Sequence, residues 1–136
     1  MKEKTARRVY LREAAAMLVV SKVAVRLLPR ERLFAWASRP PRRVRRFANH
    51  EINWVAWAVE TVGAKPWMQA LALPRALAAQ AMFRRRGIPS RLCLGVARDG
   101  DALAAHAWIE IGADKVLGGA AAARFTRLAE FGGERV

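Results

Sequence analysis

Thiols and imidazoles are scarce in this chain of 136 residues. The sequence has one cysteine, Cys93, and two histidines, His50 and His106. A single cysteine excludes an internal disulfide and is typical of a protein kept in the reducing cytoplasm. One cysteine and two scattered histidines also lack the spacing of a metal site. We therefore expect a cytoplasmic location, no internal disulfide and no bound metal.

Long apolar stretches are missing too. The longest apolar run covers 14–20 and is followed by Ser21, Lys22 and Arg26, whereas a membrane-spanning helix needs about 20 residues. The same charges interrupt the apolar region of a signal peptide, and no small-residue cleavage site follows them. The sequence thus predicts neither a transmembrane segment nor a secretory signal.

Acidic residues are few relative to basic ones. The chain has 25 lysines and arginines against 11 aspartates and glutamates, which gives a net charge of +14, yet 54% of its residues are hydrophobic. This apolar content argues against disorder, and the length suits one domain. The excess charge must therefore decorate a folded surface. It implies an anionic partner: nucleic acid, acidic lipid, or an acidic peptide or protein.

The first half of the chain has a helical pattern. Charged residues recur at helical spacing in an otherwise apolar segment over about 6–28, and Pro29 ends it. A short helix is expected over 31–37, and a third over 44–62, where apolar residues share one face.

The second half begins with a helix over 72–86 and continues with strands. Pro74 stands in the first turn of that helix, where a missing N–H is tolerated, and Gly87 ends it. Two turns, at 98–101 and 112–115, separate the expected strands at 92–96, 106–111 and 116–118. Helices followed by a short antiparallel sheet predict one α+β domain over 1–136, with a helical part over 1–63 and a core over 64–136.

Four motifs occur in a fixed order in the second half. They are ALPRALAAQ at 72–80, RRRGIP at 84–89, LGV at 94–96 and HAW at 106–108. This order strongly resembles the transglutaminase-like cysteine peptidases of lasso-peptide biosynthesis, which remove the leader from the precursor. In that family a cysteine opens the first motif. Here Ala72 occupies its position.

The resemblance covers most of the chain, and its specific part is 66–131. It implies a papain/transglutaminase-like core with a small antiparallel sheet, on which the helical N-terminal half packs. It also implies a hydrolase of lasso-peptide (RiPP) maturation that cleaves the leader–core bond by Cys–His chemistry without a cofactor. The implied partners are the leader peptide of the precursor, a separate leader-recognition (RRE) protein and the lactam cyclase that receives the core.

The resemblance assigns catalytic positions to Ala72 and His106. A cysteine at 72 would lie at the positive end of a helix, which lowers the pKa of a thiol and can hold an oxyanion. His106, on a strand facing it, would take the proton. Gln69 and Trp108 are the residues expected to contact the oxyanion or the substrate. For Gln69, a solvated turn residue is the alternative.

The acid that would orient His106 is missing from the sequence. Counting across the expected hairpin places 120–122 opposite His106. Family members commonly have an aspartate in that segment, but this chain has alanines, with Ala121 at the centre. Asp114 lies in the turn and Glu110 is too far along the strand. This is a second departure from the family pattern.

The remaining chemically interesting residues suit structural or surface roles. Cys93 lies in an apolar strand and is predicted to be a core residue, and Gln80 lies two helical turns beyond position 72. His50 is expected on a polar helix face. The arginines of 39–46 and 84–86 have no interleaved aromatics, so we expect them to dock an acidic peptide or partner protein rather than a specific nucleic acid.

With Ala72 in place of the nucleophile, the chain is predicted to be inactive. An introduced Cys→Ala change that traps a complex would explain an otherwise intact motif. A natural pseudoenzyme that binds leader or partner is the alternative, supported by the missing acid near Ala121. A basic nucleic-acid-binding module is the third interpretation, and it would leave the motifs around Pro74 and His106 unexplained.

Overall fold

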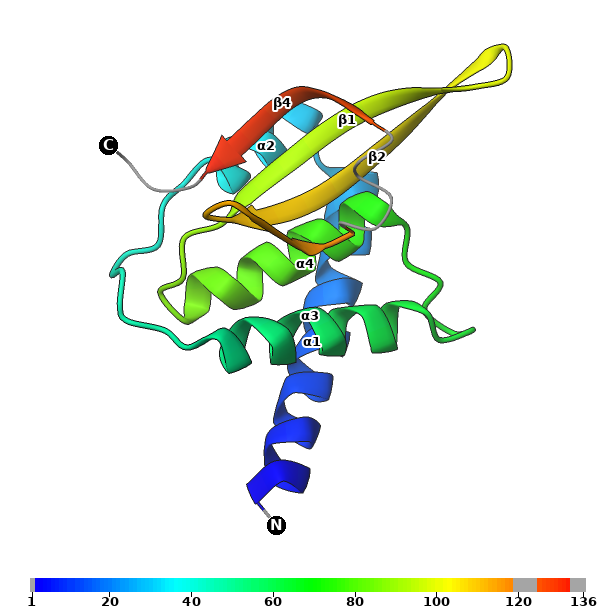
Figure 1. Ribbon diagram of the computed structural model, residues 1–136. Helices are drawn as coiled ribbons and strands as arrows, with labels where there is room; N and C mark the ends of the chain where they lie inside the picture. The colour runs from blue at the N-terminus through cyan, green and yellow to red at the C-terminus, as the bar shows by residue number, and fades with distance from the viewer. Residues whose placement is uncertain (1, 119–124, 133–136) are drawn as a thin grey trace.

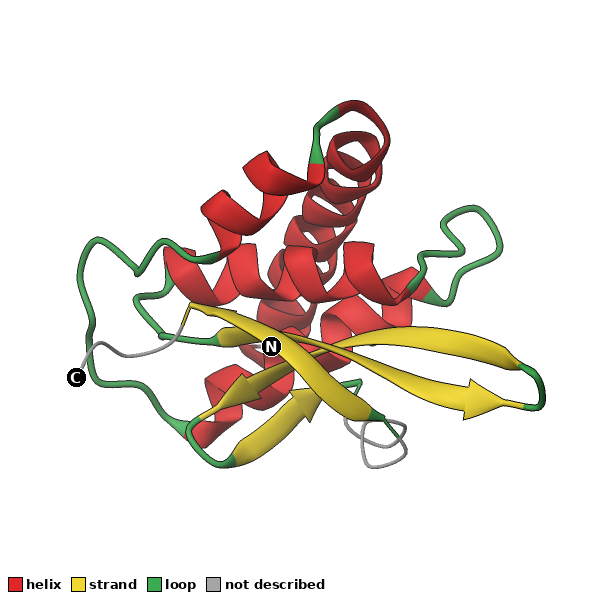
Figure 2. Cartoon of the chain, turned by 90° about the horizontal axis from the view of Figure 1, so that it is seen from above, coloured by secondary structure: helices red, strands yellow, loops and turns green. Residues whose placement is uncertain are grey.

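The computed structural model describes residues 2–118 and 125–132, which form a layer of helices against a sheet (Figures 1 and 2). This α+β architecture confirms the predicted fold class. The helices are α1 (Lys2–Leu27), α2 (Arg30–Ala37), α3 (Asn49–Gly63) and α4 (Ala72–Arg85), and the strands are β1 (Arg91–Asp99), β2 (Ala102–Ile111), β3 (Asp114–Leu117) and β4 (Thr126–Gly132).

The sheet has four antiparallel strands in the order β3-β2-β1-β4. Helix α4 lies against the inner face of the sheet, beneath β1 and β2. Helix α1 crosses both α3 and α4 and lies behind them in the view of Figure 1. The chain therefore places α4 between the sheet and α1, while α2 and α3 contact the edge strands β4 and β3. The expected hairpin between β1 and β2 is confirmed, and both strands are longer than the sequence predicted.

Helix α4 can occupy this central place because its sequence is built from small and apolar residues. Alanine has the best helix propensity and allows neighbouring elements to approach closely. Pro74 lies in the first turn, and Gly87, with a φ of 71°, follows the last turn in the left-handed conformation that glycine favours. The buried residues of the helix are Pro74, Ala76, Leu77, Ala78, Ala79, Gln80, Met82 and Phe83.

The third helix begins later than the sequence predicted, at Asn49 instead of residue 44. The preceding residues, 39–48, form an irregular segment that connects α2 to α3. Its arginines would repel one another in a helix, and here they find other partners. The N–H of Arg45 donates to the carbonyl oxygen of Gly87 at 3.1 Å, and its guanidinium pairs with Glu51 at 2.7 Å.

Strand β4 is the element that the sequence did not predict. It pairs with β1, and Phe131 stacks on Phe34 of α2 with ring centroids 4.6 Å apart. A half-buried strand is recognised by alternating apolar and polar residues. This strand lacks a clear alternation, because Leu128 is exposed and Arg127 and Glu130 are charged. Its position makes β4 the contact between the sheet and α2.

A nearly buried ion pair joins α1 to the end of α4. Glu13 accepts hydrogen bonds from Arg86 at 2.5 and 3.0 Å and from Arg85 at 2.8 Å. The side chains of Glu13 and Arg86 are only 10% and 16% exposed. Loss of one partner would leave the other charge largely out of water.

We therefore expect Glu13→Gln to lower the free energy of unfolding by about 2 kcal/mol, because hydrogen bonds to charged groups are lost while Arg86 stays buried. Urea denaturation followed by circular dichroism measures this change. Glu3→Gln is the matched control on the same helix, since Glu3 is exposed and its carboxylate lies 3.9 Å from Arg7. An equal loss in both variants would contradict a specific role of the Glu13 pair.

Candidate active site

Position 72 is the first residue of α4, as the sequence predicted. The residue before it, Leu71, is in an extended conformation and offers no side-chain cap to the helix. Pro74 has no N–H, and the N–H of Arg75 donates to the carbonyl oxygen of Leu71 at 3.1 Å. The N–H groups of Ala72 and Leu73 are therefore the ones left for a ligand, and they carry the positive end of the helix dipole. Ala72 itself is half-buried and packs against the main core. A side chain at this position has the electrostatic setting that would activate a thiol.

The segment before α4 is held by backbone contacts. The N–H of Ala70 donates to the carbonyl oxygen of Gly63 at 2.9 Å, and the guanidinium of Arg75 donates to the carbonyl oxygen of Ala70 at 2.7 Å. Lys22 on α1 donates to the carbonyl oxygen of Met68. These bonds fix the approach of the chain to position 72.

A groove of about 560 Å³ runs beside the start of α4. Trp67 and Leu71 line it and are 67% and 77% exposed, so large apolar side chains face solvent there. Gln69 also lines the groove and is exposed, with a φ of 41° in the left-handed region. The opposite wall comes from α1 and includes Val19 and Val23.

His106 lies on β2 and is half-buried. Its Nε2 lies 3.0 Å from the carbonyl oxygen of Gly118, and its ring lies beside those of Trp108 and Phe125, with centroids 5.9 and 5.0 Å away. Gly118 has a φ of 71°, and a Cβ atom there would lie 3.3 Å from Nε2. The polar neighbour of His106 among the described residues is thus a backbone carbonyl.

The alternation of strand β2 decides which way His106 points. Ala107 and Ile109 face the helices and belong to the main core. Residues 106, 108 and 110 therefore face the other side of the sheet, where Trp108 and Cys93 form a small second core against which Phe125 packs. The described contacts pair His106 with this outer cluster, whereas position 72 packs against the inner one.

The expected position of the orienting acid, near Ala121, lies outside the described residues. Near the turn of the β2–β3 hairpin, Glu110 pairs with Lys115, and a shift follows before Ile109 pairs with Leu117. Among the described residues, Gly118 lies next to the ring of His106.

Glu110 is the polar residue whose importance sequence reasoning missed. It is 5% exposed and accepts hydrogen bonds from the indole of Trp108 at 2.8 Å and from Arg91 at 3.0 Å, with a further bond from Arg127. Burial alone would raise the pKa of this carboxyl, but the three donors outweigh burial and hold it below its usual value. In the sequence, this role could have been inferred from the Trp-x-Glu spacing, which places Trp108 and Glu110 on the same face of the strand.

Cys93 lies directly opposite Trp108 on β1 and is fully buried. Burial, with the nearby negative charge of Glu110, raises the pKa of its thiol to about 11. The thiol therefore stays protonated at neutral pH, and the prediction that Cys93 is a core residue is confirmed.

Gln80 is buried in the interior of the fold and joins three elements. Its Nε2 donates to the carbonyl oxygens of Ala37 at 3.0 Å and Ser90 at 3.3 Å, with Phe131 at 3.5 Å. Its Oε1 has no hydrogen-bond partner in the part of the chain that the structure describes. The role is structural, because the amide ties α4 to the end of α2 and to β1 and β4.

Metal ligands do not converge within residues 2–118 and 125–132, where no three His, Cys, Asp or Glu side chains gather. His50 is exposed on α3, as expected. None of the described helices is both long and apolar enough to cross a membrane.

A central helix that begins at the site and packs under an antiparallel sheet fits a cysteine-peptidase-type α+β fold. The family model described as the transglutaminase-like superfamily matches residues 15–130. The chain belongs to this superfamily. Comparisons with curated proteins and with solved structures gave no match.

The geometry predicts different reactivity for thiols at two positions. We expect Cys93 to resist a thiol reagent such as DTNB at pH 7–8 in the folded protein, because it is fully buried and its pKa is about 11. In the Ala72→Cys variant we expect one additional thiol to react quickly, since position 72 is partly open at a helix N-terminus. Rapid labelling of Cys93 in native protein would contradict this assignment, and Cys93→Ser in the same background identifies the reacting thiol.

The buried carboxylate gives a stability that depends on pH. The pKa of Glu110 is lowered in the folded protein. Its contribution to the free energy of unfolding is therefore fully present above the ordinary pKa of a glutamate, and it is lost as the pH falls through the lowered pKa of the folded state. We expect Glu110→Gln to cost about 3 kcal/mol at pH 7, since it leaves two arginines without their buried partner. Urea denaturation at pH 7 and at successively lower pH measures the free energy of unfolding of both proteins. We expect the difference between Glu110→Gln and the parent protein to become smaller as the pH falls. A constant difference would argue against an ionised Glu110.

Proposed function

We propose that this chain is a leader-processing domain of lasso-peptide maturation. In the form with a cysteine at position 72 it hydrolyses the leader–core bond, and as given, with Ala72, it binds without cleaving. The observation that carries the proposal is the place of position 72: it opens α4, at the positive end of the helix dipole, beside an open groove with exposed apolar walls. The motifs of the sequence support the lasso-peptide assignment within the superfamily.

The reaction would proceed by acyl transfer. A thiolate at 72 attacks the carbonyl carbon of the scissile bond, and the charge on its oxygen develops near the first N–H groups of α4. His106 is the proposed proton carrier: it gives the proton of the thiol to the leaving amine, and water then releases the acyl group from the sulfur. For this role the imidazole must leave the carbonyl oxygen of Gly118. Because His106 faces away from the helices, β2 must also rearrange to present residue 106 toward position 72. Gln69, on the wall of the groove, is the proposed amide donor to substrate.

The contacts of His106 favour a second candidate, a natural pseudoenzyme. The ring is held by Gly118, Trp108 and Phe125 on the outer face of the sheet. Such a domain would bind the leader or a partner protein through its grooves and leave cleavage to another protein. In either case we propose that a separate leader-recognition (RRE) protein presents the peptide, that the lactam cyclase receives the core and that the proteins meet in the cytoplasm.

Restoring the nucleophile separates the two candidates. We expect Ala72→Cys, with the leader-recognition protein supplied, to cleave a matched precursor, and we expect an added His106→Ala change to lower the rate by about 100-fold or more, because proton transfer is lost. Mass spectrometry of the released leader measures the cleavage. Cys93→Ser in the Ala72→Cys background is the control and should leave the rate nearly unchanged.

If Ala72→Cys binds the precursor but never cleaves it, the domain is a pseudoenzyme. If cleavage occurs and survives His106→Ala at the same rate, His106 is not the proton carrier. Circular dichroism of each variant shows whether the fold is intact.

A further inference from the structure

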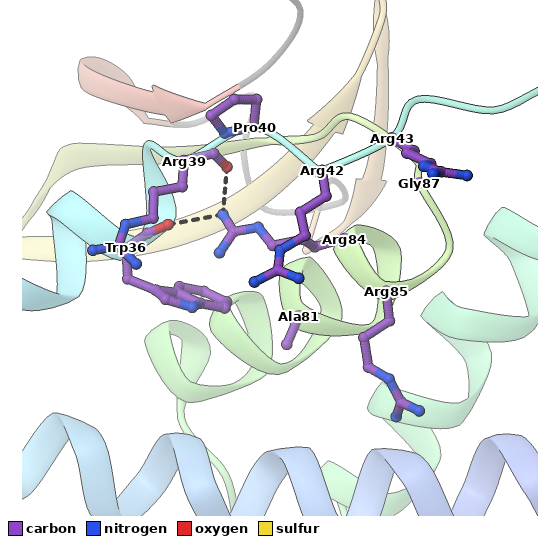
Figure 3. A pocket seen from close by; sticks show the side chains of 9 residues that line it. All are labelled: Trp36, Arg39, Pro40, Arg42, Arg43, Ala81, Arg84, Arg85 and Gly87. Atoms are coloured by element: carbon purple, nitrogen blue, oxygen red, sulfur yellow. Dashed lines mark hydrogen bonds between the residues drawn. The ribbon is translucent and has the colours of Figure 1, made fainter.

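An arginine-rich cleft lies at the opposite end of α4 from position 72. It has a volume of about 630 Å³ and is lined by Trp36 from α2, by the 39–48 segment and by the last turn of α4 (Figure 3). Five arginines take part, and none of its lining residues is acidic. The arginines are Arg39, Arg42, Arg43, Arg84 and Arg85.

Arg84 serves as the floor of the cleft. Its guanidinium stacks on the ring of Trp36 at 4.0 Å and donates to the carbonyl oxygens of Trp36 at 2.8 Å and Arg39 at 2.7 Å (Figure 3). Burial, together with the like charge of Arg39, lowers the pKa of Arg84. These contacts fix the end of α2 and hold the arginine-bearing segment over α4.

Two of the other arginines are free to bind a ligand. Arg39 and Arg42 are exposed, and neither forms an ion pair in the described part of the chain. Arg42 descends from the 39–48 segment toward α4 (Figure 3). Arg85 differs, since it shares the carboxylate of Glu13 with Arg86. The cleft therefore holds several positive charges without a resident carboxylate, a setting that attracts an anion.

An apolar hollow of about 280 Å³ adjoins this cleft and shares Trp36 and Ala81 with it. Its walls are mostly apolar side chains of α1, α2 and α4, among them Met17, Val20 and Leu77, and Ser21 and Arg32 also line it. Val20 is 60% exposed at its rim. A ligand that fills both depressions must carry negative charge at one end and an apolar group at the other.

We infer that the cleft and the hollow together bind an acidic–apolar peptide segment, with carboxylates on Arg39 and Arg42 and an apolar side chain between α1, α2 and α4. The guanidinium forks suit carboxylates, and the shared wall places the two sites within two or three residues of extended chain. A nucleic acid would leave the hollow empty, and Arg84 already covers one face of the Trp36 ring, so that face cannot stack on a base.

This inference rests on the proposed function for the identity of the peptide, which would be the leader. The cleft and position 72 are separated by the length of α4, about 18 Å from residue 72 to residue 84. Some six extended residues would span that distance. An acidic segment docked in the cleft would thus hold the scissile bond near the start of α4.

The test uses the chain with Ala72 and a fluorescein-labelled synthetic peptide with two adjacent glutamates, one alanine and two leucines. Fluorescence anisotropy measures its affinity. We expect glutamine in place of the glutamates to weaken binding by about tenfold or more, and Arg39→Glu with Arg42→Glu to do the same. Arg98→Glu with Lys115→Glu changes the net charge equally at exposed sites on the sheet and should change the affinity less than about threefold.

The hollow has its own test. Val20→Ser should weaken binding of the leucine peptide by a few-fold and leave a matched peptide with alanines in place of leucines unaffected. Equal losses from both charge-reversal pairs would overturn the inference, since the peptide would then be sensing only the overall charge. So would a thymidine oligonucleotide that binds as tightly and depends on the same two arginines. Changes in the peptide itself decide the question even if an arginine variant fails to fold.

The outcome is independent of catalysis. Binding without cleavage by the Ala72→Cys variant would remove the peptidase proposal and leave the cleft as a peptide site. Cleavage by that variant with unchanged kinetics after Arg39→Glu and Arg42→Glu, and no peptide binding, would remove the cleft and leave the peptidase.

Discussion

The burial of helix α4 is the constraint on which the rest of the structure depends. The sheet covers one side of the helix, and α1 and α3 cover others. Only a segment rich in alanine can be approached so closely from several directions without a loss of packing. The helix therefore fixes the relative positions of the sheet and the N-terminal helices. The candidate active site and the arginine-rich cleft lie at its two ends, so their positions are fixed with it.

The polar residues of α4 extend this control to segments far away in sequence. Gln80 ties the end of α2 to the sheet, Arg84 holds carbonyl oxygens at and after the end of α2, and Arg86 anchors α1 through Glu13. Gln80 and Arg84 lie in the second half of the helix, and Arg86 directly follows its last residue. In the first turn, Arg75 bonds to Ala70 and Glu60, while the N–H groups of Ala72 and Leu73 are left for a ligand. The C-terminal end of α4 thus holds other elements in place, whereas its N-terminal end leaves backbone N–H groups for a ligand.

The sequence allowed the helices to be placed because their signals are local. Pro74 and Gly87 mark the ends of α4, and these signals act through backbone geometry alone. The start of α3 and strand β4 could not be read in the same way. The 39–48 segment is kept out of a helix by the pairing of Arg45 with Gly87 and Glu51. Gly87 is far away in sequence, and Glu51 follows the segment in α3. Strand β4 exists because β1 offers an edge and α2 offers Phe34.

The site shows the same division between local and distant information. The motif around Ala72 predicted the first residue of α4 correctly, whereas the surroundings of His106 depend on how β3 returns beside β2. The register shift after Glu110 brings Gly118 to the imidazole, and a shift of this kind leaves no mark in the hydrophobic pattern. The strand parity, however, was readable: isoleucines at 109 and 111 require the inner face, so His106, Trp108 and Glu110 must take the outer one. Bringing His106 to position 72 therefore requires more than the right residues in the right order. It requires Gly118 to release the ring and β2 to present residue 106 on the inner face of the sheet.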